Sequence, residues 1–135
     1  MADTEAPGSV VPSLEAGCLT LTLNYPERRN PLSNETAMAL AAALKAADCD
    51  PAVRVVVITG AGGHFSAGGN LHELLENTKQ GGHVHWQEGA HWVDLFKSLM
   101  HMSKPTICKV RGAAMAGGCG LVAAADFAYA ADDAI

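Results

Sequence analysis

The chain has 135 residues, 49% of them hydrophobic and 17% charged, a composition that argues against intrinsic disorder and suits one globular domain. Nine basic and fourteen acidic residues give a formal net charge of −5, so the chain offers no basic surface for nucleic acid. Residues 1–10 lack the basic and then apolar pattern of a secretion signal. The Ala- and Gly-rich stretch 113–131 contains Asp126, and buried globular structure explains it better than a membrane span.

Cysteine and histidine spacing indicates packing rather than metal binding. The chain has four cysteines, Cys18, Cys49, Cys108 and Cys119, and no two of them form a CxxC pair. We therefore predict reduced packing residues and a cytoplasmic location. The histidines of one aromatic-rich stretch, His83, His85 and His91, do not combine with cysteines or carboxylates into a recognised ligand pattern, and we expect no metal site.

The first half of the chain predicts a leader, two strands and a helix. Residues 1–13, rich in Pro, Gly and Ser, are expected to form a flexible leader, and residues 14–135 the domain. Leucine and threonine alternate over 18–24, which predicts a half-buried strand. Ser33 can cap a helix that ends before Asp50-Pro51, because proline disfavours helix in the preceding residue. The apolar run 54–59 predicts a buried strand, and the loop GAGGHFSAGGN after it leads into a short helix from residue 71.

The second half repeats this order. We expect a mobile stretch from Gly81-Gly82 to about residue 90. A helix follows, and its apolar face is formed by Trp92, Leu95, Phe96, Leu99 and Met100. After it, 106–111 predicts a second buried strand, and GAAMAGGCG leads into LVAAA and a third core strand over 126–130. The predicted fold class is α/β, built from a unit of strand, Gly-Ala loop, Ala-Gly-Gly and helix.

The triplet Ala-Gly-Gly occurs at 67–69 and again at 116–118, each time shortly after a run of β-branched residues. A strand that turns through glycines into a helix leaves backbone N–H groups unpaired, and glycine permits close approach by a ligand. Two such corners that face each other could hold one oxygen from both sides, as an oxyanion hole does. Tight packing of helix on strand, without any ligand, explains the spacing equally well.

Three other glycine motifs fit less well. A phosphate-binding loop needs Gly-Lys-Ser/Thr, whereas Gly118 is followed by Cys119. A nucleophile elbow needs Gly-x-Ser-x-Gly, but His64 stands two residues before Ser66. The stretch Gly118-x-Gly120-x-x-Ala123 matches the loose dinucleotide fingerprint, yet the strand over 106–111 ends too early for it. An NAD-dependent oxidoreductase is therefore a distant third hypothesis.

Three stretches together resemble the crotonase superfamily of enoyl-CoA hydratases and isomerases: LTLNYPERRNPLS, RVVVITGAGGHFSAGGNL and KPTICKVRGAAMAGGCGLVAAADFAYAADDA. The resemblance implies a crotonase-like spiral of ββα units, truncated here before the C-terminal helices, in proteins that assemble as trimers or hexamers. It implies an acyl-CoA thioester as partner, with coenzyme A as part of the substrate and with no metal or further cofactor. The implied activity is hydration of an enoyl-CoA or a shift of its double bond.

The resemblance also implies which residues form the site. The two amides of an oxyanion hole would be those of Gly69 and Gly117. Arg28 and Arg29 would lie near coenzyme A, although a solvated surface charge is an equally weighted alternative for each. The other implied binding residues belong to the first glycine stretch: Ser66, Ala67, Gly68, Asn70 and Leu71.

Two departures from the family pattern bear on the reaction. Two-glutamate hydratases carry a catalytic Glu after GGC, and this position is Gly120 here. The second carboxylate of the family lies beyond Ile135, so the chain lacks both expected glutamates. The departures favour an isomerase-like reaction over water addition. They also raise a second hypothesis, a non-catalytic fragment that binds acyl-CoA or associates with other subunits.

A few other side chains near the implied acyl site could move a proton if they came within hydrogen-bond reach. These are Glu73, Glu76, His72 and the histidines of 83–91, and for each we expect a solvated surface position instead. Trp86 and Trp92 are expected to be packing or lid residues.

Overall fold

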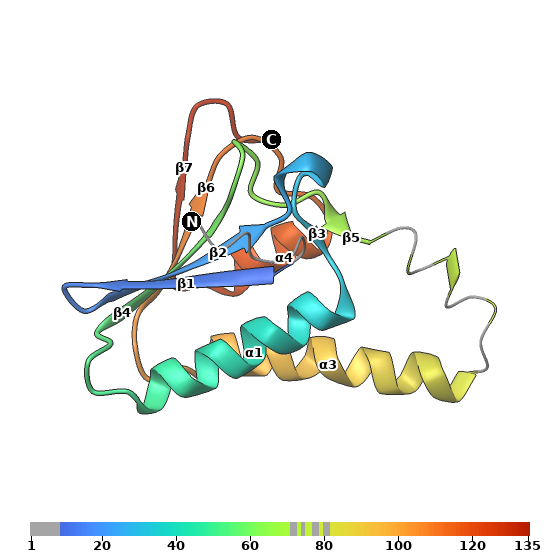
Figure 1. The fold of residues 1–135 in the computed structure, drawn as a ribbon, viewed down its shortest axis with the longest axis horizontal. Coiled ribbons are helices and arrows are strands. Elements are labelled where there is room, and N and C mark those ends of the chain that lie inside the picture. The colour runs from blue at the N-terminus through green and yellow to red at the C-terminus, as the bar shows by residue number, and fades with distance from the viewer. Residues whose placement is uncertain (1–8, 71–72, 74, 77–78, 80–81) are drawn as a thin grey trace, which may run out of the picture.

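A computed structural model describes residues 9–70, 73, 75–76, 79 and 82–135. Its main sheet has the spatial order β1 (Ser9–Glu15), β2 (Cys18–Asn24), β4 (Val55–Gly60), β6 (Thr106–Val110) and β7 (Phe127–Ala130) (Figure 1). β1 and β2 form an antiparallel hairpin, and every other neighbouring pair is parallel. The helices are α1 (Asn34–Cys49), α3 (Gly82–Met100) and α4 (Gly117–Ala124), with a 3-10 turn, η1 (Pro26–Arg28).

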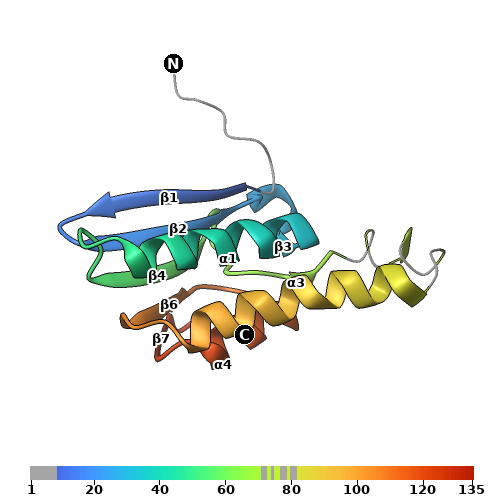
Figure 2. The same ribbon diagram turned by 90° about the horizontal axis from the view of Figure 1, so that it is seen from below.

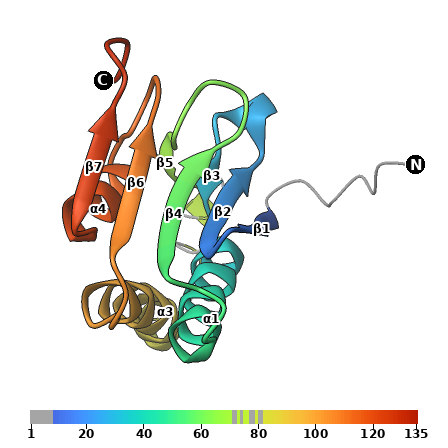
Figure 3. The ribbon, with the colours of Figure 1, turned by 90° about the vertical axis from the view of Figure 1, so that its left-hand side faces the viewer.

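A second, shorter set of backbone pairs runs beside the main sheet. β3 (Pro31–Leu32) pairs in parallel with β5 (Gly68–Gly69), and Ser66 forms a parallel bridge with Ala114. Ile135 continues this set, since its N–H donates to the Gly112 carbonyl and its carbonyl accepts from the Ala114 N–H. Each pass of the chain thus adds a strand to the main sheet and a pairing to the second set (Figure 3). The expected α/β spiral is confirmed.

The core lies between the main sheet and the two long helices. α1 and α3 run side by side across one face of the sheet (Figure 2), and buried residues recur at helical spacing along α1. In β2, β4 and β6 buried side chains alternate with side chains that are mostly only partly buried. The core includes Leu21, Leu23, Val56, Ile58, Cys108 and Val110 from the sheet and Leu40, Leu44, Leu95 and Leu99 from the helices.

Local signals explain both ends of α1. The Ser33 hydroxyl accepts the N–H of Thr36 at 3.0 Å, which satisfies one of the unpaired amides of the first turn. The helix ends at Cys49, before Asp50-Pro51. Lys104 reaches this end from another part of the chain, and its ammonium donates to the carbonyl of Ala47 at 2.5 Å. The predicted start and end of this helix are confirmed.

The N-terminal strand corrects the predicted leader. Residues 9–13, expected to be loose, form most of β1 and pair with β2. Ala16 and Gly17 both have positive φ, 49° and 83°, which is the two-residue turn that matches the twist of a hairpin. Pro12 argued against a strand in the sequence, but proline is tolerated where a strand forms the edge of a sheet.

Two further elements differ from the prediction. α3 begins at Gly82, about ten residues before the expected start. From Trp92 onward α3 contacts α1, through the Trp92–Asn34 hydrogen bond and the Lys45–Asp94 ion pair. The first turns of α3 extend beyond α1 (Figure 2), and Trp86, Gly89 and Ala90 are exposed there. β7, expected in the core, forms an edge of the sheet, and all four of its residues are exposed. Among the described residues, no helix combines the length and apolar character that crossing a bilayer requires.

Candidate active site

The first glycine stretch, residues 62–70, is called the first corner below. Gly62 and Gly63 have φ of 70° and 84°, values that glycine adopts at little cost. Asn30 is only 1% exposed, and it stabilises this loop although it belongs to another part of the chain. Its side-chain amide donates to the carbonyls of Ala61 and His64, both at 2.8 Å. Its side-chain oxygen accepts the N–H of Tyr25, also at 2.8 Å. All three bonds leave the Asn30 amide well satisfied in a buried position.

Ser66 lies at the centre of the first corner and is fully buried. Its hydroxyl donates to the Asn30 carbonyl at 2.8 Å and accepts the N–H of Gly68 at 3.0 Å. Because both hydrogen-bonding roles of the hydroxyl are used within the protein, this side chain positions the corner instead of facing a ligand.

The second glycine stretch, residues 112–120, is called the second corner, and it lies directly against the first. The Ser66 N–H donates to the Ala113 carbonyl and the Ser66 carbonyl accepts the N–H of Met115, each at 2.9 Å. A Cβ placed on Gly68 would lie 2.7 Å from the Met115 carbonyl oxygen. A Cβ placed on Gly118 would lie 2.9 Å from the Ser66 Cβ. Glycine is therefore required on both sides of the contact.

The two corners share one backbone register. Ser66 and Ala114 form a bridge between the two segments. Two residues after the bridge, both segments have a positive φ, 91° at Gly68 and 45° at Ala116. The third residue on each side is Gly69 in one corner and Gly117 in the other. These are the two glycines that the sequence resemblance singles out.

The amides of these two glycines differ from those of their neighbours. In the part of the chain that the structure describes, hydrogen bonds that reach beyond the helices and strands use the N–H groups of Gly68, Asn70 and Gly118. None of them uses the N–H of Gly69 or Gly117. Gly117 is also the first residue of α4, where amides have no partner within the helix.

Two aromatic side chains of α3 pack on α4. A Cβ placed on Gly117 would lie 3.5 Å from the Trp92 ring, and a Cβ placed on Gly120 would lie 3.0 Å from the Phe96 ring. The Trp92 indole N–H donates to the Asn34 side-chain oxygen at 3.0 Å, which fixes the ring. The sequence placed both aromatics on one apolar helix face but gave no sign of which glycines they would meet.

The acidic residues considered from the sequence have other partners. Both carboxylate oxygens of Glu73 lie within hydrogen-bond reach of the Asn34 N–H, at 3.2 and 3.3 Å, at the positive end of α1. Glu76 pairs with Lys79 at 2.9 Å on the exposed surface. His72 and Leu71 lie outside the described residues, as do the side chains of His83 and His85.

The turn that carries the two arginines lies against the first corner. Ala67 donates its N–H to the Arg29 carbonyl at 2.7 Å, and Asn70 donates its N–H to the Leu32 carbonyl at 3.0 Å. Both arginine side chains are exposed, and the Arg28 guanidinium lies 5.6 Å from the centre of the Tyr25 ring. The structure therefore brings Arg28 and Arg29 to the same side of the fold as Ala67, Gly68 and Asn70.

The cysteines are unpaired, and they differ in exposure. Cys49 and Cys119 are exposed, whereas burial raises the pKa of the Cys108 thiol to about 12. Across the described part of the chain, no three histidine, cysteine or acidic side chains come together in a way that could hold a metal ion.

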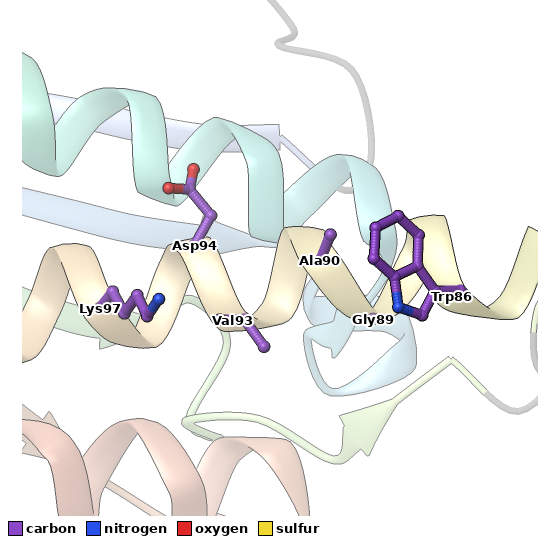
Figure 4. Close-up of a pocket in the computed structure, with 6 residues that line it drawn as sticks. All are labelled: Trp86, Gly89, Ala90, Val93, Asp94 and Lys97. Atoms are coloured by element: carbon purple, nitrogen blue, oxygen red, sulfur yellow. The ribbon is translucent and has the colours of Figure 1, made fainter.

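A hollow of about 600 Å³ lies along α3 (Figure 4). It is lined by Trp86, Gly89, Ala90, Val93, Asp94 and Lys97. Trp86 and Val93 are 75% and 53% exposed, and none of the lining residues belongs to either corner. The hollow is an open stretch of helix surface, separate from the two glycine amides.

Comparisons with known proteins show which family the chain resembles. A sequence profile of the family described as Enoyl-CoA hydratase/isomerase matches residues 13–135. A candidate enoyl-CoA hydratase of Thermus thermophilus is 43% identical over 112 residues, 83% of this chain and 44% of that protein. The 1,2-epoxyphenylacetyl-CoA isomerase of Escherichia coli is 33% identical over 126 residues, 93% of this chain and 48% of that protein.

Solved structures show the same likeness. The crystal structure of an enoyl-CoA hydratase from Polaromonas sp. JS666 has a TM-score of 0.89 at 40% identity, and the match covers 93% of this chain and 49% of that one. The chain thus spans about half the length of the relatives that it matches.

Proposed function

The chain belongs to the enoyl-CoA hydratase/isomerase family, and we propose that the amides of Gly69 and Gly117 together bind the thioester oxygen of an acyl-CoA. The shared register of the two corners carries this proposal, because each of the two amides lies three residues after the bridge that joins Ser66 to Ala114. An oxygen that lies between two such amides can accept a hydrogen bond from both, at the usual distance of about 2.9 Å from each nitrogen.

Such a site would act on the enolate. When a base removes a proton from the carbon next to the thioester carbonyl, the electron pair moves onto the carbonyl oxygen. Two fixed N–H donors stabilise this oxyanion more than the neutral carbonyl, which lowers the barrier. The proton can then return to a different carbon, so that the double bond shifts. No metal or redox cofactor takes part in this proposal, and coenzyme A enters as part of the substrate.

The position of the arginine turn supports the binding of coenzyme A. Arg28 and Arg29 are exposed beside the first corner, where a guanidinium can contact a phosphate through two N–H groups. Ala67, Gly68 and Asn70 would contribute backbone along the thioester arm. This arrangement would hold the acyl group at the two amides.

Isomerisation fits the site better than water addition. Gly120 has no side chain to move a proton, and the Phe96 ring fills the space beside it. The base and acid of the reaction would then come from elsewhere in the whole protein. By analogy with the family, we propose assembly as a trimer or hexamer, and the unpaired cysteines suit a cytoplasmic location.

Replacing Gly117 by proline tests the two-amide site. Proline removes the N–H yet suits the first position of a helix. Gly117→Ala is the matched control, because it keeps the N–H and its Cβ would make ordinary contacts of 3.4 and 3.5 Å with Leu32 and Trp92. The ligand is acetoacetyl-CoA, whose enolate absorbs in the near ultraviolet. We expect Gly117→Pro to lose about 100-fold in affinity for the enolate and Gly117→Ala to lose little. Equal binding by the proline variant would refute the assignment.

The second candidate function is a non-catalytic one. Gly120 and the Phe96 ring beside it suit a chain that binds acyl-CoA or associates with other subunits without turnover. Incubation of the chain with but-3-enoyl-CoA distinguishes the two functions. Turnover to the conjugated isomer would exclude the non-catalytic function, and binding without turnover would support it.

A further inference from the structure

Two aromatic side chains of α3 lie opposite two glycines of α4. Trp92 and Phe96 are four residues apart on α3, and Gly117 and Gly120 are three residues apart on α4, so each pair lies on one helix face. Trp92 meets Gly117 and Phe96 meets Gly120. Both rings are only partly buried, so each keeps a surface that a ligand could contact.

The surface formed by Trp92, Phe96, Gly117 and Gly120 is called the wall below, and it is apolar over its whole length. α4 carries no acidic residue in its first turn and no basic residue in its last. The one polar atom of the two rings, the Trp92 indole N–H, already donates to Asn34. A group held at the Gly117 amide would therefore meet ring surface, without a charge or a free donor from these rings.

Phe96 also limits what position 120 can be. A Cβ there would lie 3.0 Å from the Phe96 Cζ and 3.3 Å from its Cε1, closer than side chains normally pack. Phe96 and Gly120 are thus a matched pair, in which the ring takes the space that a larger residue at position 120 would need.

We propose that Trp92 and Phe96 are the residues that select the acyl group, favouring apolar, ring-sized groups over groups that end in a carboxylate. The proposal rests on the two-amide site proposed above. An apolar group gains by leaving water for the ring surface, whereas a carboxylate would lose hydration against rings that offer it no free hydrogen-bond donor. The selection lies in the wall, and the two amides hold every thioester alike.

Calorimetric titration of the chain with three saturated thioesters tests the proposal, because none of them has a double bond to react. They are 3-phenylpropanoyl-CoA, butanoyl-CoA and glutaryl-CoA, with free coenzyme A as the reference. We expect the phenylpropanoyl ester to bind about tenfold more tightly than the glutaryl ester, which corresponds to about 1.4 kcal/mol. In the double variant Trp92→Ala, Phe96→Ala this ratio should fall to about twofold. Phe96→Leu, which keeps apolar volume without a ring, should retain part of it.

The outcomes separate this proposal from the one on which it rests. If the thioesters bind more tightly than coenzyme A but the wild-type ratio is near one, or survives in the double variant, the wall does not select and the two-amide site stands. If no thioester binds more tightly than coenzyme A, both proposals fail.

A second measurement needs no ligand. Gly120→Ala should lower the melting temperature in the wild-type background and raise it slightly in a Phe96→Ala background, because the ring that it would meet is gone and alanine favours a helix more than glycine does. Equal losses in both backgrounds would show that Phe96 does not occupy the space beside position 120, which would overturn the matched pair and the wall built on it.

Discussion

The two corners share a triplet and a register, yet they reach it differently. In the first corner Gly68 has the positive φ, and the chain continues as strand β5 against β3. In the second corner Ala116 has the positive φ, and the chain continues as helix α4. Positive φ costs alanine more than glycine, because its Cβ crowds the backbone.

Their supports also differ. The first corner is held by polar bonds from the buried Asn30 and Ser66. The second is held by its backbone pairing to Ser66 and by the aromatic side chains packed on α4. The comparison indicates that the two corners are equivalent when they are aligned on the residue with positive φ, two residues after the bridge. Aligning the Ala-Gly-Gly triplets instead would match Gly69 with Gly118 and not with Gly117.

The largest expected effect comes from breaking the polar support of the first corner. Asn30→Asp replaces the donor to Ala61 and His64 with a buried carboxylate that faces two carbonyl oxygens. We expect the free energy of unfolding to fall by about 3 kcal/mol or more, measured by urea denaturation. Asn24→Asp, the same change at a half-buried position at the end of β2, is the control. Similar losses in both variants would mean that Asn30 does not hold the corner.

A single substitution gives the first corner an alanine at its positive-φ position, as the second corner has. Gly68→Ala puts a Cβ 2.7 Å from the Met115 carbonyl oxygen at a φ of 91°. Backbone strain and overlap should together lower stability by about 3 kcal/mol, again read from the urea midpoint. Ala67→Gly is the control, since it changes the neighbouring residue in the opposite direction. A Gly68→Ala variant as stable as the wild type would contradict the close contact between the corners.

Sequence patterns predicted the local parts of this fold well. The Ser33 cap, the end of α1 at Cys49 and the alternation in β2 all depend on residues close together in the chain, and all are confirmed. The predicted leader over 1–13 was wrong from residue 9 on, because β1 forms by pairing with β2, and the predicted start of α3 was about ten residues too late. Gly69 and Gly117 came from a family resemblance, since spacing alone left packing as an equal alternative.

The supports of the site were beyond the reach of the sequence. Asn30 contacts carbonyls 31 and 34 residues away, and no local pattern marks such a contact. The family resemblance gave Ser66 as one residue of a binding segment, whereas the burial of its side chain is a property of the folded structure. Phe96 was visible only as one member of an apolar stripe.

Relieving the strain in the second corner should give a smaller effect of opposite sign. Ala116→Gly makes the second corner resemble the first at the residue with positive φ. We expect stability to rise by about 1 kcal/mol, measured by the same denaturation. Ala114→Gly is the control; this residue lies in the bridge with negative φ, and glycine there should only destabilise. A loss of stability in Ala116→Gly would mean that the Ala116 methyl contributes more by packing than its backbone loses by strain.

The smallest perturbation addresses the second corner alone, because the first corner contains no cysteine. Cys119 is exposed on the first turn of α4, two residues after Gly117, and Cys49 is exposed far away at the end of α1. Iodoacetamide should therefore modify both quickly in the folded chain. Cys108 should react only on unfolding, because a pKa of about 12 leaves about a thousandfold less thiolate than the usual value of 9.0.

Acetoacetyl-CoA bound at Gly117 should slow the modification of Cys119 several-fold and leave Cys49 unaffected, which mass spectrometry of the peptides can follow. Equal protection of both cysteines would show that the ligand acts on the whole fold, and protection of neither would place it away from the second corner.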